Sequence, residues 1–85
     1  MTTVAVSVGS AVGLHARPAA IIAEAAGMLD SEVTIAIPGR VAVDASSALL
    51  IMSLGAGRDA VVEVAGQDSD AVNAIATLIQ SDLDA

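Results

Sequence analysis

The sequence predicts an α+β fold in two layers, an open-faced sandwich in which an antiparallel four-stranded sheet carries three helices on one face. Two observations support this prediction. Short runs of alternating apolar and small polar residues are separated by segments with helical patterns, and these occur in the order βαββαβα. The connections between them are short, which favours antiparallel neighbours. With 85 residues, we expect one domain, residues 1–85, around one hydrophobic core.

The first strand and the first helix flank a loop of small residues. Residues 3–8, TVAVSV, alternate with period two, as in a strand with one buried face. Residues 9–13 begin and end with glycine and form the loop. Residues 16–29, ARPAAIIAEAAGML, are rich in alanine, and Pro18 is tolerated only in the first turn of a helix. The helix therefore begins beside His15.

A hairpin follows this helix. Residues 33–37, VTIAI, alternate as a second strand, and Pro38 and Gly39 occupy the positions that a type II turn favours. Residues 41–43 are the returning strand.

The second half of the chain supplies a short helix, a strand and a final helix. Ser46 or Ser47 is a candidate N-cap for the short helix, which we expect to stop at Gly55. Residues 60–66 form the fourth strand, and residues 68–70 start the last helix. The apolar positions of that helix recur at spacings of three and four: Ala71, Ile75, Leu78 and Ile79.

Composition excludes several classes of function. The net charge is −7, the chain has no lysine and only three arginines, so nucleic acid and anionic membranes are not expected partners. With no cysteine and one histidine, we expect no disulfide and no metal site. The apolar runs are too short to span a bilayer, and the N-terminus lacks the positive region of a signal peptide. We therefore expect a cytoplasmic protein.

The stretch GLHARPAA, residues 13–20, concentrates the chemistry of the chain. It places His15 and Arg17 at the start of a helix, where Ala16 and Arg17 would supply backbone N–H groups to an anion. Pro18 has no N–H group and presets a sharp helix start. Neither cation favours the positive end of a helix, so packing does not explain them. The simpler interpretation is that His15 is only a cap or a surface residue.

A phosphohistidine site fits the same residues. A neutral imidazole is nucleophilic near neutral pH and can carry a covalent group, while arginine can hold two oxygens of a phosphoryl group. Phosphoryl transfer asks the protein for positioning and charge stabilisation, so neither a metal nor a cofactor is expected.

Two stretches resemble HPr, the histidine-containing phosphocarrier family of the bacterial phosphoenolpyruvate-dependent sugar phosphotransferase system: GLHARPA at 13–19 and, more loosely, SSALLIMSLG at 46–55. The resemblance covers nearly the whole chain. It implies that His15 accepts a phosphoryl group on Nδ1 from phosphorylated enzyme I and passes it to sugar-specific IIA domains, with Arg17 binding the phosphate. Such a carrier is a co-substrate of enzyme I rather than an independent enzyme.

The resemblance also implies a docking face made by the first and second helices, which carries over to Ala20, Ala48, Leu49 and Met52. This sequence departs from the family there, because HPr proteins often carry lysines on that face and this chain has none. We expect the carrier to be a monomer, since one face must serve two partners.

Some HPr proteins are phosphorylated on a serine at the start of the short helix by an HPr kinase/phosphorylase. Alignment on MSLG places Ser47 at this position, with Ser46 beside it and less favoured. A simple N-cap is the better interpretation of either serine.

Three alternatives remain open. The His15 loop could bind an anion without covalent chemistry, in a small module of ferredoxin-like topology. The phosphorylated domain could instead regulate a transcription factor or a metabolic enzyme, or serve a nitrogen-related branch of the phosphotransferase system. The motif does not separate the sugar branch from the nitrogen branch.

Overall fold

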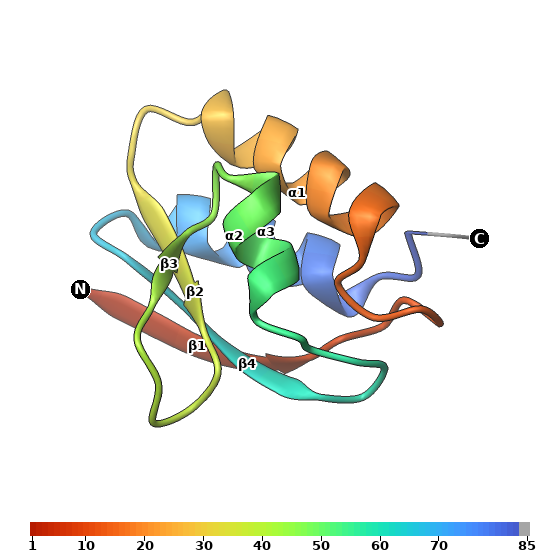
Figure 1. Cartoon of the computed structure of the whole chain (residues 1–85). Helices are drawn as coiled ribbons and strands as arrows, with labels where there is room; N and C mark the ends of the chain where they lie inside the picture. Colours follow the sequence, from red (N-terminus) through yellow and green to blue (C-terminus); the bar gives the residue numbers. More distant parts are fainter. Residues whose placement is uncertain (84–85) are drawn as a thin grey trace.

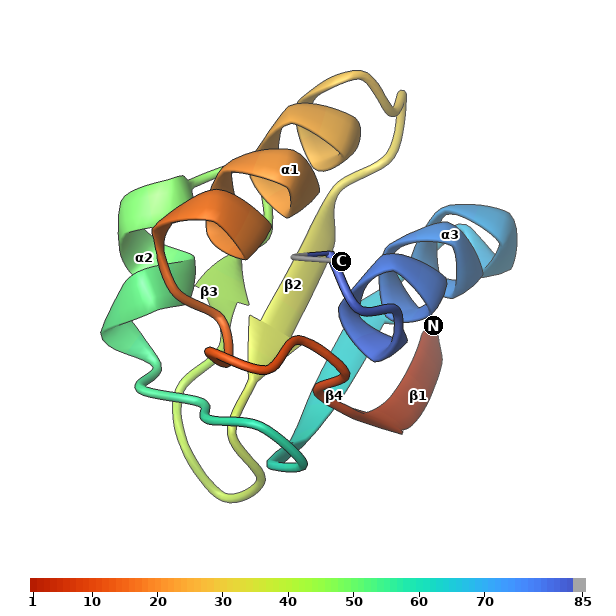
Figure 2. The same cartoon turned by 90° about the vertical axis from the view of Figure 1, so that its right-hand side faces the viewer.

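The computed structural model describes residues 1–83 and confirms the predicted order of elements and fold class. Figures 1 and 2 show the helices on one face of a four-stranded antiparallel sheet with strand order β1-β4-β2-β3. The elements are β1 (Thr2–Ser7), α1 (Ala16–Gly27), β2 (Val33–Ala36), β3 (Val43–Asp44), α2 (Ala48–Ser53), β4 (Val61–Gly66) and α3 (Ser69–Gln80). Among residues 1–83, no helix combines the length and apolar character needed to cross a bilayer.

The core lies between the sheet and the helices and is built without aromatic residues. Val62 and Val64 of β4 are fully buried, and they pair with Val6 and Val4 of the neighbouring strand β1. The alternation read from the sequence thus places one side of each strand against the helices. Among the largest fully buried side chains are five isoleucines: Ile22, Ile35, Ile51, Ile75 and Ile79.

Helix α1 ends two residues earlier than the sequence pattern suggests. The prediction extended it to Leu29, but the helix stops at Gly27, and the N–H groups of Met28 and Leu29 bond to the carbonyls three residues back. The last turn is therefore tightened. Met28 is 80% exposed, so burial of its side chain does not favour a further helical turn.

The hairpin has the predicted turn but a shifted strand. Arg40 N–H donates to the Ile37 carbonyl, and Gly39 has φ +83°. A regular hairpin closed by this turn would pair Ile35 with Ala42, yet Ile35 pairs with Val43. One extra residue is accommodated before the ladder begins, as in a β-bulge. The predicted strand at 41–43 was therefore wrong in its bounds, and strand β3 covers only Val43–Asp44.

The two ends of the sheet are distinct in position and in the loops that they carry. At one end Ser7 pairs with Val61, and the β1–α1 loop continues from it to His15. We call this the His15 end. At the opposite end Gly66 pairs with both Thr2 and Val33.

Candidate functional site

His15 is the N-cap residue of α1, so the helix begins beside it, as the sequence predicted. Its backbone is extended (φ −88°, ψ −167°), and its carbonyl accepts the first helical hydrogen bond from Ala19 N–H at 2.8 Å. Its side chain makes no capping hydrogen bond and is exposed. The imidazole is thus accessible to a partner and takes no part in holding the helix.

The first backbone amides of α1 have no acceptor. Within residues 1–83, the N–H groups of Ala16 and Arg17 make no hydrogen bond, and the first turn carries no acidic side chain. Pro18 is buried and contributes no N–H group. Free donors and the positive end of the helix dipole therefore lie beside the exposed imidazole, an arrangement that attracts an anion.

Arg17 lies in the first turn of α1 with its side chain exposed. In the described part of the chain, no carboxylate forms an ion pair with it, so its guanidinium is available to a ligand. A guanidinium can hold two oxygens of a phosphoryl group.

The loop before His15 is fixed against the loop that follows α2. Leu14 is 4% exposed, and its N–H donates to the Ala56 carbonyl at 2.9 Å. Gly13 has φ +74°, and a Cβ atom there would lie 2.5 Å from the Ala56 carbonyl oxygen and 2.7 Å from Gly57 Cα. Only glycine fits so close an approach at this φ. The imidazole is therefore carried on an anchored loop.

Sequence reasoning missed this anchoring loop. It placed the end of a helix at Gly55 and gave residues 56–57 no role, whereas these residues support the segment that carries His15. The one local signal was Gly13 itself, directly before an apolar residue and the histidine.

The predicted docking residues lie on α1 and α2, two helices that pack against each other. Ala20 is exposed, and Ala48 and Met52 are half-buried. Leu49 is 73% exposed and Leu50 42% exposed. The structure therefore adds Leu50 to the apolar residues that helix α2 presents at the surface.

Ser46 and Ser47 have different structural roles. Ser47 is the N-cap of α2, and its hydroxyl oxygen accepts from Leu50 N–H at 3.3 Å. Ser46 donates to Asp44 through its backbone N–H at 2.9 Å and its hydroxyl at 2.7 Å. Both bonds favour the charged carboxylate and hold the pKa of Asp44 below its ordinary value. The N-cap expected at one of these serines is thus Ser47.

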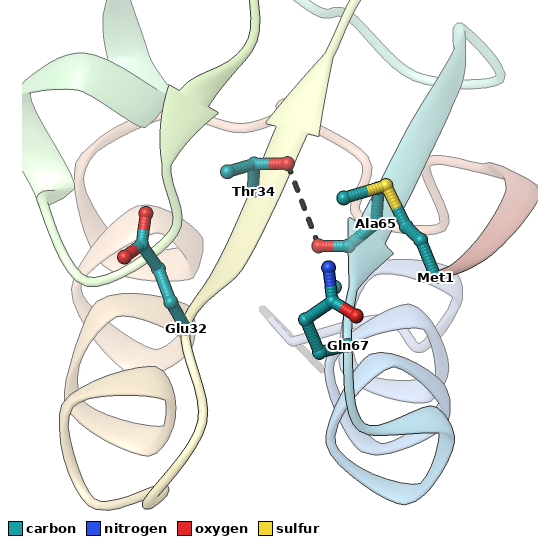
Figure 3. Close-up of a pocket in the computed structure, with 6 residues that line it drawn as sticks. Met1, Glu32, Thr34, Ala65 and Gln67 are labelled. Carbon is teal, nitrogen blue, oxygen red and sulfur yellow. Dashed lines mark hydrogen bonds between the residues drawn. The ribbon is translucent and has the colours of Figure 1, made fainter.

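A surface hollow of about 250 Å³ lies at the opposite end of the sheet from His15. Figure 3 shows Glu32 and Gln67 on its two sides, with a hydrogen bond of 3.4 Å from Thr34 Oγ1 to the Ala65 carbonyl between strands β2 and β4. No histidine or arginine lines it. This hollow plays no part in the His15 site.

An exposed histidine with an extended backbone, at the start of a helix on an open-faced sandwich, suits a phosphocarrier class of protein, and comparison with known proteins identifies the family. Residues 2–81 match the family model described as the PTS HPr component phosphorylation site. The chain belongs to the HPr phosphocarrier family of the phosphotransferase system.

Solved structures of HPr proteins resemble the whole chain. Phosphocarrier protein HPr from Bacillus anthracis strain Ames is 32% identical, with a TM-score of 0.84 over 93% of this chain and 96% of that one. HPr from Thermoanaerobacter tengcongensis is also 32% identical, with a TM-score of 0.86 over 100% and 98%.

A further similar structure is that of a protein whose name describes a different role. The catabolite repression protein Crh of Bacillus subtilis is 30% identical, with a TM-score of 0.65 over 96% of this chain and 97% of that one. That protein is described as a swapped, intertwined dimer.

Proposed function

We propose that His15 accepts a phosphoryl group from phosphorylated enzyme I and passes it to the IIA domains of sugar permeases. The observation that carries this proposal is an exposed imidazole, free of any capping bond, beside the unpartnered amides of Ala16 and Arg17. Membership of the HPr family supports the same donor and acceptors.

The residues of the site have different roles in phosphoryl transfer. The Nδ1 lone pair of neutral His15 attacks phosphorus, and the bond from phosphorus to the donor enzyme breaks as the new N–P bond forms. The amides of Ala16 and Arg17 and the guanidinium of Arg17 face the charge on the phosphoryl oxygens. On transfer, the acceptor group of a IIA domain attacks phosphorus, and the N–P bond breaks as the new bond to phosphorus forms. The electron pair of the N–P bond returns to Nδ1, so the imidazole is released unchanged. No proton needs to be stored by the carrier between the two steps.

Exposure suits a carrier because the same site must be reached by two enzymes in turn. We propose that Ala20, Ala48, Leu49 and Met52, together with Leu50, form the apolar surface on which both enzymes dock.

We also propose that residues 1–85 act as one phosphocarrier domain, as a monomer and in the cytoplasm. Sedimentation at micromolar concentration would show a dimer if this monomer assignment is wrong.

A regulatory phosphate on Ser47, or on Ser46, remains a prediction by resemblance. It would place negative charge beside the Asp44 carboxylate and on the docking surface, so docking should weaken. Incubation with an HPr kinase and ATP, followed by peptide mass spectrometry, tests whether either serine becomes phosphorylated. Absence of phosphate on both serines would leave Ser47 with its capping role alone.

The relay is tested by following one phosphoryl group through both steps. Protein phosphorylated by enzyme I and phosphoenolpyruvate, then separated from both, should lose its phosphate to an added IIA domain within the mixing time. Phosphate retained on the carrier in the presence of several sugar IIA domains would overturn the sugar assignment. Rapid transfer to a IIA domain of the nitrogen-related branch would then identify the alternative acceptor.

A further inference from the structure

All three arginines of the chain lie at the His15 end of the sheet. Arg17 is in the first turn of α1, and Arg58 precedes β4, whose first residue Val61 pairs with Ser7. Arg40 lies in the turn that connects β2 to β3. Because Val33 pairs with Gly66 and Ala36 with Glu63, strand β2 runs toward the His15 end, and its turn extends beyond it.

Acidic residues gather at the opposite end. Asp30, Glu32 and Asp44 line one surface hollow there. Asp68 and Asp70 belong to the start of α3, which follows Gly66, and a Cβ atom on Gly66 would lie 2.7 Å from the Glu32 carbonyl oxygen. The arginines therefore lie at the His15 end of the sheet and five of the ten carboxylates lie at the opposite end, while Asp59 and Asp82 share the His15 end with the arginines.

Arg58 is joined to the loop that carries His15. The residue before it, Gly57, is in close approach to Gly13, and the residue after it, Asp59, donates its N–H to the Val8 carbonyl at 2.9 Å. Val8 N–H in turn donates to Ala60 at 2.9 Å. The backbone on both sides of Arg58 is thus fixed to the segment that leads from β1 to His15. Figures 1 and 2 show the two loops side by side.

The side chain of Arg58 serves no visible structural purpose. It is exposed, and within residues 1–83 it forms no ion pair or hydrogen bond, not even with its neighbour Asp59. A cation held beside an active histidine, yet unused by the fold, is available to a partner.

We propose that Arg58 is a docking cation, which pairs with a carboxylate on the surface of the phosphoryl donor when His15 is engaged. The inference rests on the proposed function of His15. A chain of net charge −7 repels an acidic surface from most directions, and only the His15 end presents cations to it. Because Arg17 faces the phosphoryl group, Arg58 is the remaining cation fixed to the His15 loop. It thus orients the encounter and takes no part in the bond-making step.

Steady-state transfer from phosphorylated enzyme I tests this role, with the concentration of the carrier varied at low and high salt. For Arg58→Gln we expect KM to rise roughly two- to fivefold at low salt, which is the range of a single exposed ion pair. The difference should shrink at high salt because salt screens exposed charges. We expect kcat to stay unchanged, and the isolated phosphorylated variant should lose its phosphate by hydrolysis at the wild-type rate.

Arg40→Gln is the matched control because it removes the same charge from the same end of the molecule, in a turn that is not bonded to the His15 loop. Its KM should stay within error of wild type. Equal effects of the two substitutions would overturn the proposal, since net charge alone would then explain them. So would a fall in kcat or faster hydrolysis in Arg58→Gln, which would place Arg58 on the phosphoryl group. Failure of the wild-type protein to accept phosphate would refute the His15 function instead.

Discussion

Gly13 determines the position of His15, although it has no side chain. Its positive φ is one that residues with a Cβ atom rarely adopt, and a Cβ atom there would overlap the Ala56 carbonyl. The position of His15 therefore depends on the absence of a Cβ atom at residue 13. Composition alone does not reveal this requirement.

Gly13→Ala should destabilise the protein and slow its phosphorylation. The positive φ alone costs an L residue about 1–2 kcal/mol, and the overlap at 2.5 Å adds to it. Gly39→Ala is the control, because Gly39 also has positive φ but has no atom within 4 Å of the new Cβ. Urea unfolding should show the larger loss for Gly13→Ala, and only that variant should be phosphorylated more slowly. Equal losses would mean that the contact with Ala56 contributes nothing.

Asp44 gives the stability a dependence on acid pH. Hydrogen bonds from Ser46 lower its pKa in the folded state, so its stabilisation is present above the unfolded pKa and is lost as the pH falls through the folded pKa. Ser46→Ala removes the hydroxyl donor. The gap in free energy of unfolding between wild type and this variant should therefore be widest at neutral pH and close below the ordinary pKa of 3.8. A gap that is constant with pH would rule out this linkage.

At the scale of elements, α2 is the part of the docking surface that depends most on a cap. It has six residues, and among its side chains only Ile51 is fully buried. Helices this short gain little from propensity and rely on packing and capping.

Ser47→Ala should therefore lower the free energy of unfolding by about 0.5–1 kcal/mol, the lower part of the range for N-caps, because its hydrogen bond is long. Ser53→Ala in the same helix is the comparison. Ser53 donates to the Leu50 carbonyl and caps no N–H group, so its loss should cost less in thermal or urea unfolding. A cost at Ser53 equal to that at Ser47 would contradict the capping role.

The elements that sequence reasoning predicted best are those whose signal is local. The alternation of β1, the turn at Pro38 and Gly39, and the capped start of α3 each need only neighbouring residues. The start of α1 at His15 belongs to the same group. It was therefore possible to predict the order of elements and the place of the histidine.

The features that escaped prediction depend on contacts between distant segments. The one-residue shift in register that pairs Ile35 with Val43 depends on how the bulge fits the sheet, and residues 41–42 carry no sequence signal that predicts it. The approach of Gly13 to residues 56–57 becomes visible only when the two loops are brought together. The same holds for Arg58, whose place beside the His15 loop depends on the whole topology.

At the scale of the whole molecule, the topology separates a stable body from an exposed site. Buried isoleucines and valines between the sheet and the helices hold the fold, whereas His15 and Arg17 lie outside that core. Loss of an exposed side chain changes the free energy of unfolding only slightly. The His15→Ala protein should thus fold normally and lack only its chemistry.

The most direct test of the account is therefore the intact mass of wild-type protein and of His15→Ala after incubation with enzyme I and phosphoenolpyruvate. We expect the wild-type protein to gain one acid-labile phosphate, with a phosphorus NMR signal of Nδ1-phosphohistidine, and the folded variant to gain none. Phosphate on the variant, or no phosphate on the wild type with an enzyme I that phosphorylates another HPr protein, would contradict the account. The second result would leave GLHARPAA as a loop that binds an anion without covalent chemistry.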